Sequence, residues 1–167
     1  MSYFVFGLAD LEAGATGARD HAHIRSTMEG CATAAGLFVS VEREREPTIL
    51  AEMRGDFDAE AAVPFLCLKK PADDTSDALI SPYDVGIEGA ARGAAAIADW
   101  VRGVLRDGGC NAVRLWLTEG WDDAFERWKC HPDRLAPLLE RRLREENDIP
   151  SMQITVSPRF EEALTPR

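Results

Sequence analysis

The sequence contains no run that approaches the about 20 apolar residues needed to span a bilayer, so it predicts no membrane segment. The apolar residues 1–9 have no basic residue before them, and Asp10 interrupts them, unlike a secretory signal. The chain has only 4 cysteines, at long spacings, and in 167 residues this favours reduced thiols over a disulfide framework. We therefore expect a cytoplasmic protein.

Motifs for common chemistries are also missing. Neither a phosphate-binding glycine loop nor a Gly-x-Ser-x-Gly elbow occurs. Structural zinc needs four converging ligands, but His21 and His23 fall on a predicted helix about 200° apart, and Cys130-His131 has no Cys-x-x-Cys partner. We expect His21 and His23 to form a solvated surface feature. The sequence therefore predicts no metal and no cofactor. A small enzyme or small-ligand-binding domain with a pocket near His21/His23 or Cys130/His131 remains the alternative.

Positive charge is in short supply. Against 29 acidic residues there are 19 Lys and Arg, a net charge of −10, which repels nucleic acid and anionic membranes. The last predicted helix holds one arginine cluster, interleaved with glutamates: Arg134, Arg141, Arg142 and Arg144. Mixed signs at helical spacing indicate a solvated, salt-bridged face, so we predict no nucleic-acid or membrane partner.

Apolar residues make up 46% of the chain and charged residues 29%, which is ordinary globular composition. The periodicity predicts a β-α-β-β-β-α-β-α-β order and one α+β domain over residues 1–167, with 158–167 as a candidate frayed tail. We expect a mixed, mainly antiparallel sheet of about five or six strands packed by two or three helices. The predicted strands are 4–8, 37–44, 48–54, 63–69, 112–117 and 149–156, and the predicted helices are 18–35, a long helix ending at Gly108-Gly109, and 133–146.

Three patterns define the expected core. In the long helix, an apolar stripe follows helical spacing: Ile87, Ala90, Ala91, Ala94, Ile97, Ala98, Val101, Val104 and Leu105. Alternation in the strand after it places Val113, Leu115 and Leu117 on one face. Asp133 is the predicted N-cap of the last helix, whose inward residues are Leu135, Leu138, Leu139 and Leu143.

Acidic residues gather in two stretches. Residues 56–77 hold six acidic residues (Asp56, Asp58, Glu60, Asp73, Asp74, Asp77) against Lys69 and Lys70. Residues 118–126 hold Glu119, Asp122, Asp123 and Glu126 with no basic residue, and three of the four tryptophans lie within 116–128. Carboxylates steer a cationic partner and aromatic side chains anchor it, so this pattern favours a docking surface. An equally weighted and compatible interpretation is that Trp116 and Phe125 cover the sheet while Asp122 and Asp123 cap a short helix near Ala124.

Residues 114–125, Arg-Leu-Trp-Leu-Thr-Glu-Gly-Trp-Asp-Asp-Ala-Phe, form a predicted strand followed by Glu-Gly-aromatic-Asp. This stretch resembles one found in some small acidic immunity proteins of bacterial toxin systems. The resemblance covers about a dozen residues and implies a cytosolic single-domain protein that blocks a cognate toxin domain, often a nuclease with a basic active site.

The leading hypothesis is therefore a binding protein rather than an enzyme: an immunity protein or antitoxin for a basic toxin domain. Its predicted contact residues are Glu119, Trp121, Asp122, Asp123 and Glu126, with Asp73, Asp74 and Asp77 as a second patch. A homodimer formed through exposed aromatic side chains is a further alternative.

Overall fold

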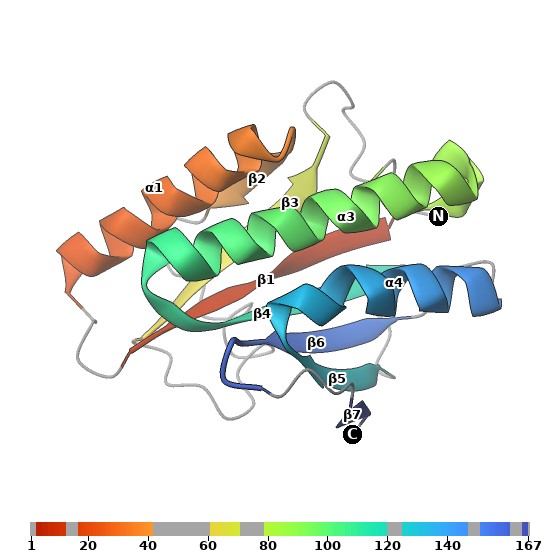
Figure 1. Ribbon diagram of the computed structural model, residues 1–167. Helices are drawn as coiled ribbons and strands as arrows, with labels where there is room; N and C mark the ends of the chain where they lie inside the picture. The colour runs from red at the N-terminus through yellow and green to blue at the C-terminus, as the bar shows by residue number, and fades with distance from the viewer. Residues whose placement is uncertain are drawn as a thin grey trace.

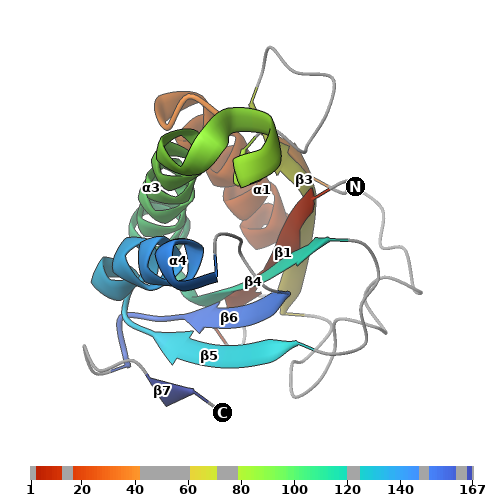
Figure 2. The ribbon, with the colours of Figure 1, turned by 90° about the vertical axis from the view of Figure 1, so that its right-hand side faces the viewer.

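The computed structural model describes residues 3–12, 17–41, 61–70, 79–119, 125–146, 151–160 and 165–166. In this part of the chain, three helices cover one face of a seven-stranded sheet (Figures 1 and 2). The helices are α1 (Ala18–Ala34), α3 (Pro82–Gly108) and α4 (Pro132–Glu146). The strands are β1 (Tyr3–Leu11), β2 (Phe38–Val41), β3 (Ala62–Lys69), β4 (Cys110–Glu119), β5 (Glu126–Cys130), β6 (Met152–Val156) and β7 (Thr165–Pro166).

The sheet order is β2-β3-β1-β4-β6-β5-β7, and every pair of neighbours is antiparallel except β5 and β6. The α+β class and the single domain are confirmed, with seven strands in the described ranges instead of the expected five or six. The predicted strand 48–54 lies outside those ranges. Among the described helices, none has the length and apolarity needed to cross a membrane.

Two strands were not predicted. The sequence of β5 is Glu-Arg-Trp-Lys-Cys, in which three of five residues are charged, so it lacks the apolar pattern that predicts a strand. β5 pairs in parallel with β6, and α4 is the crossover that connects these two parallel strands. β7 pairs with β5, so residues 165–166 of the expected frayed tail belong to the sheet.

The main core lies between the helices and the sheet. Val113, Leu115 and Leu117 are all buried on this face, as predicted, and so are the four leucines of α4. Trp100 of α3 ties the layers together, because its Nε1 donates to the Met28 carbonyl at 3.0 Å and its ring meets Phe65 edge-to-face at 4.7 Å. The predicted N-cap is wrong by position: Asp133 lies inside the first turn of α4, and its backbone N–H donates to Nδ1 of His131.

Most of the predicted apolar stripe of α3 is buried, but Ala91 and Leu105 are half-buried and Ile87 is 45% exposed. Gly86, with φ 71° and ψ 171°, breaks the helical path and separates the first turn of α3 from the rest. Ile87 therefore does not continue the stripe that begins at Ala90.

A smaller apolar cluster lies on the sheet face opposite the helices. Leu8, Ala62 and Trp116 are buried there, with Phe6, Leu66 and Phe125 packed against them. The Phe6 and Trp116 rings stack at 5.8 Å between centroids. The interpretation that Trp116 and Phe125 cover the sheet is thus confirmed, but the short helix expected near Ala124 is wrong, because strand β5 begins at Glu126.

Candidate functional site

The strand pairing brings the anchor points of two acidic segments to one end of the sheet. Tyr3, the first residue of β1, pairs with Glu119, the last residue of β4. β3 runs antiparallel to β1, so it ends at Lys69 on the same side, and β5 starts there because Glu126 lies beside Met152 at the start of β6. We call this the acidic end: it is where the chain leaves β3 toward residues 71–78, and where it passes from Glu119 to Glu126.

Proximity in the sequence did not predict this arrangement. The stretch 56–77 contains β3, whose eight residues span roughly 26 Å at about 3.3 Å per residue, so residues 56–60 and 71–77 are attached to opposite ends of that strand. In contrast, four strand spacings of about 4.8 Å place the end of β3 about 19 Å from the start of β5. Residues 73–77 and 119–126 are therefore attached to the same part of the molecule.

Most of the predicted contact residues lie outside the described ranges: Asp73, Asp74, Asp77, Trp121, Asp122 and Asp123. For Glu119 only the backbone is described, in the ladder with Tyr3. Their side-chain contacts to a partner thus stay a prediction, while the framework that anchors their segments is visible.

Ser151 connects the two anchor points of the 119–126 segment. Its carbonyl accepts the Glu126 N–H at 3.0 Å, and its hydroxyl lies 3.3 Å from the Thr118 hydroxyl. These bonds fix the spacing between the end of β4 and the start of β5 at the acidic end.

Glu126 is half-buried, and both of its carboxylate oxygens are already engaged. Oε1 pairs with Nη2 of Arg142 on α4, and Oε2 accepts from Nε1 of Trp128 at 3.1 Å. Arg142 also donates to Glu145 at 3.1 Å, and the Arg141 guanidinium lies over the Trp128 ring. Glu126 therefore holds β5 against α4. Its role as a partner contact stays a prediction.

The acidic end also includes side chains that the sequence reasoning missed. At the start of α3, Tyr83 is 80% exposed and Ile87 45%, and Asp84 and Glu88 are exposed beside them in the chain. Figure 1 shows this helix end at the same end of the molecule as the start of β1. The signal for their exposure in the sequence was Gly86, because a glycine near the start of a helix is a common place for the helical path to be interrupted.

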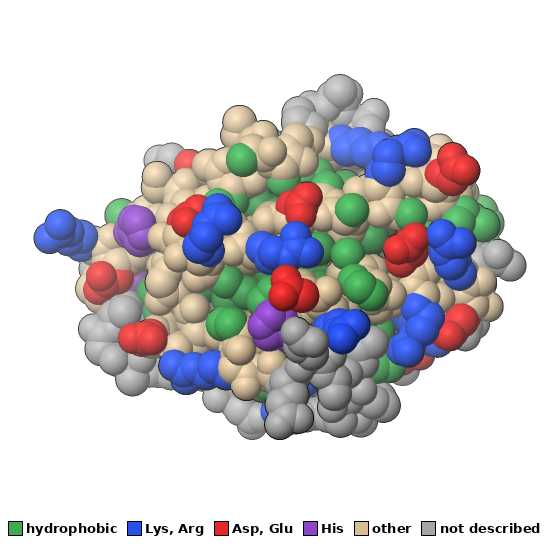
Figure 3. Space-filling model, in the orientation of Figure 1, with side chains coloured by type: hydrophobic (Ala, Val, Ile, Leu, Met, Phe, Trp, Pro, Cys, Tyr) green, Lys and Arg blue, Asp and Glu red, His purple; other side chains and the backbone are tan. Residues whose placement is uncertain are grey.

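Acidic and basic residues are nearly equal in number within the described ranges, so the excess of acidic residues lies in the segments outside them. Of the 29 acidic residues, 15 lie outside the described ranges, against 4 of the 19 basic residues. On the helix-covered face, basic and acidic side chains alternate (Figure 3). The arginines of α4 follow the predicted salt-bridged pattern, with Arg144–Glu140 at 2.9 Å and Arg141–Glu145 at 3.9 Å.

The histidines predicted for an alternative pocket have different environments. His21 is buried, and His23 is exposed, with Nε2 donating to the Asp107 carbonyl at 3.0 Å. This corrects the expectation that both are solvated. Cys130 is fully buried, while Nδ1 of the half-buried His131 accepts from Asp133 N–H at 3.2 Å. Within the described ranges, no three His, Cys, Asp or Glu side chains are grouped to hold a metal ion.

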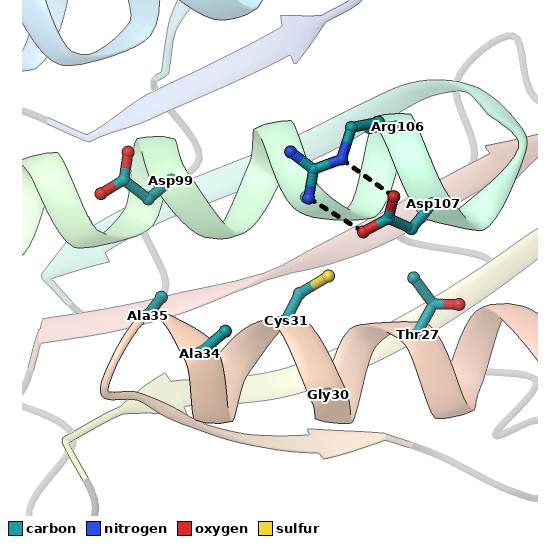
Figure 4. Close-up of a pocket in the computed structure, with 9 residues that line it drawn as sticks. Thr27, Gly30, Cys31, Ala34, Ala35, Asp99, Arg106 and Asp107 are labelled. Atoms are coloured by element: carbon teal, nitrogen blue, oxygen red, sulfur yellow. Dashed lines mark hydrogen bonds and ion pairs between the residues drawn. The ribbon is translucent and has the colours of Figure 1, made fainter.

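A groove of about 340 Å³ separates α1 from α3, and Cys31 points into it (Figure 4). Burial, and then the negative charge of Asp107, raise the pKa of the Cys31 thiol. On the opposite wall, Arg106 binds Asp107 through Nε at 2.9 Å and Nη2 at 3.0 Å, and this hydrogen bonding lowers the Asp107 pKa. The groove therefore holds a protonated thiol and a mutually satisfied ion pair, not an activated nucleophile.

The other buried thiols predict an alkaline loss of stability. Desolvation raises the pKa of Cys110 and of Cys130 from 9.0 to about 12. Unfolded chains lose these protons near pH 9 while the folded protein retains them, so the free energy of unfolding falls by about 1.4 kcal/mol per pH unit per thiol as pH rises from 9 to 12. Urea midpoints measured from pH 8 to 11 should fall less steeply in Cys110→Ala/Cys130→Ala than in wild type. Equal slopes would refute this assignment.

The fold and site thus define an α+β protein whose sheet has one end connected to two acidic segments. No protein family, no curated protein and no solved structure matches this chain. The function is therefore inferred from the residues and the fold of this chain.

Proposed function

We propose that this protein is a binding protein, an immunity protein or antitoxin that neutralises a cognate toxin domain with a basic surface. The observation that carries the proposal is the shared attachment of residues 71–78 and 119–126 to the acidic end. Residues 71–78 include Asp73, Asp74 and Asp77, and residues 119–126 include Asp122 and Asp123, while Lys69, Lys70 and Arg127 are the basic residues beside these segments in the chain.

The size of this region suits a protein partner. An interface of standard size covers about 800 Å² per partner, a patch about 30 Å across. The anchor points at the acidic end span about 19 Å, so a single partner surface reaches both segments. Clustered carboxylates then accelerate encounter with a cationic cleft, and they block that cleft without any bond being made or broken.

The charge-reversed variant Asp122→Lys/Asp123→Lys tests this proposal. The probe is the basic C-terminal domain of a secreted protein encoded beside the gene of this chain. We expect an association rate constant about tenfold to 100-fold lower and a weaker dependence on salt, because steering acts on the association rate. Stopped-flow mixing at several salt concentrations measures both quantities.

A matched control changes net charge equally at another place. Glu12 follows the end of β1 and Asp20 lies in the first turn of α1, and both are exposed. Both lie at the end of the sheet opposite the acidic end, because Leu11 pairs with Cys110 at the start of β4. Glu12→Lys/Asp20→Lys should lower the association rate much less. Equal effects of the two variants would show that the total charge of the protein, and not the acidic end, sets the association rate. If no neighbouring gene encodes such a basic domain, or if the protein does not bind that domain, the proposed function is wrong.

The second candidate is a small-ligand-binding domain, and the α1–α3 groove is the observation that favours it. Ala34 lines this groove and is exposed, so Ala34→Tyr should fill it while the fold is retained. A small-molecule screen by thermal shift supports this candidate only if a hit stabilises wild type and not Ala34→Tyr.

A further inference from the structure

The backbone that leads into α3 is held tightly against the body of the protein. Leu79 and Ile80 are 1% and 0% exposed, so they anchor this segment in the core. A Cβ at Gly93 would lie 1.6 Å from the Leu79 carbonyl oxygen, which shows how closely the segment passes the helix. The segment that precedes the start of α3 is therefore held in one position by packing against the core.

The first turn of α3 is itself constrained. The N–H groups of Asp84 and Val85 both donate to the Ser81 carbonyl, at 3.2 and 3.1 Å, and Pro82 fixes its own φ. Val85 packs onto Gly89, where a Cβ would lie only 2.7 Å from the Val85 Cβ. Gly86 then takes φ 71°, a conformation that a residue with a Cβ rarely adopts.

The start of α3 nevertheless presents two large apolar side chains to solvent, Tyr83 in the constrained turn and Ile87 directly after Gly86. Tyr83 is 80% exposed and Ile87 45% exposed, and hydrophobic atoms reach the surface around the start of α3 (Figure 3). Preorganised backbone reduces the entropy lost on binding, and tyrosine is enriched among the residues that dominate interface energies. These are the properties of an interface anchor.

We propose that Tyr83 and Ile87 are the apolar anchors of the docking surface, and that they insert into an apolar pocket rimmed by lysines or arginines on the basic partner. The occupant is inferred from charge complementarity. In the chain, the exposed Asp84 and Glu88 alternate with Tyr83 and Ile87, and the acidic residues of 73–77 precede all four. The nearest basic residue after Ile87 on α3 is Arg92, so a partner with basic residues around its pocket fits this surface. This inference rests on the proposed function, since it names further contacts of the acidic end.

Dissociation kinetics test the anchors separately from the acidic segments. With the same basic domain as the probe, we expect the dissociation rate constant to rise about tenfold or more in Tyr83→Ala and about 100-fold in Tyr83→Ala/Ile87→Ala. Tyr83→Phe keeps the ring and should dissociate much as wild type does. Because both side chains are exposed, all three variants should stay folded, which circular dichroism checks.

Failure of the anchor proposal and failure of the proposed function give different results. An unchanged dissociation rate in the double variant, with slower association in Asp122→Lys/Asp123→Lys, overturns the anchors and leaves the proposed function standing. The same losses in Phe160→Ala, a half-buried ring after β6 at the opposite end, overturn the anchors as well. A wild-type dimer in sedimentation that becomes monomeric in Tyr83→Ala/Ile87→Ala assigns these residues to self-association and overturns the basic partner. Absence of any binding by wild type refutes both proposals together.

Discussion

Replacing Gly93 with alanine is expected to destabilise the protein by about 3 kcal/mol or more. The new Cβ would lie 1.6 Å from the Leu79 carbonyl oxygen and 2.7 Å from the Leu79 carbonyl carbon. These are backbone atoms, so either α3 or the buried segment at Leu79 and Ile80 must move. Urea denaturation should show a clearly lower midpoint, and binding through Tyr83 should weaken because its base has shifted.

Gly30→Ala provides the matched control for this variant. Gly30 is exposed inside α1, and a Cβ there meets nothing within 4 Å. Alanine should therefore stabilise the protein by about 0.5–1 kcal/mol, the ordinary difference in helix propensity. If Gly93→Ala were as stable as Gly30→Ala, the close approach of Leu79 to α3 would be wrong.

Trp100→Ala should cost about 3–5 kcal/mol, the usual range for truncating a buried aromatic side chain. Trp100 is fully buried, where it packs on Phe65 of β3 and donates to the Met28 carbonyl of α1. Its removal leaves a cavity where α1, α3 and the sheet meet.

Trp100→Phe separates packing from hydrogen bonding. The smaller ring retains most of the contact with Phe65 but loses the Nε1 donor, so we expect a loss of about 1–2 kcal/mol from the missing hydrogen bond and reduced volume. Urea midpoints of the two variants measure the difference. Equal losses in both would mean that the hydrogen bond, and not the packed ring, is the larger contribution.

The apolar faces were predictable from the sequence because the period of side chains in an element is a local property. Leu135, Leu138, Leu139 and Leu143 needed only the helical repeat, and Val113, Leu115 and Leu117 only alternation. β5 was missed because its alternate residues, Glu126 and Trp128, face α4, and Arg142 offsets the charge of Glu126. That compensation comes from another element and leaves no periodic signal.

The candidate site was predictable only in part. The sequence marked two acidic stretches, but it treated residues 56–77 as one, whereas β3 lies within that stretch and its two ends fall at opposite ends of the sheet. It counted Ile87 as core, since a single glycine does not show that Gly86 adopts φ 71°. Tyr83 and Ile87 emerged as exposed anchors only after this break was seen.

The sequence alone determined the net charge of −10, the order of most elements and the buried faces of α3, α4 and β4, because each depends on composition or on neighbours within a few residues. Only the tertiary structure decided that β3 and β4 end on either side of β1, and that α3 starts at the same end of the molecule. Strand partners are chosen by hydrogen bonds and packing between residues far apart in the chain, and these preferences are not written in any local pattern.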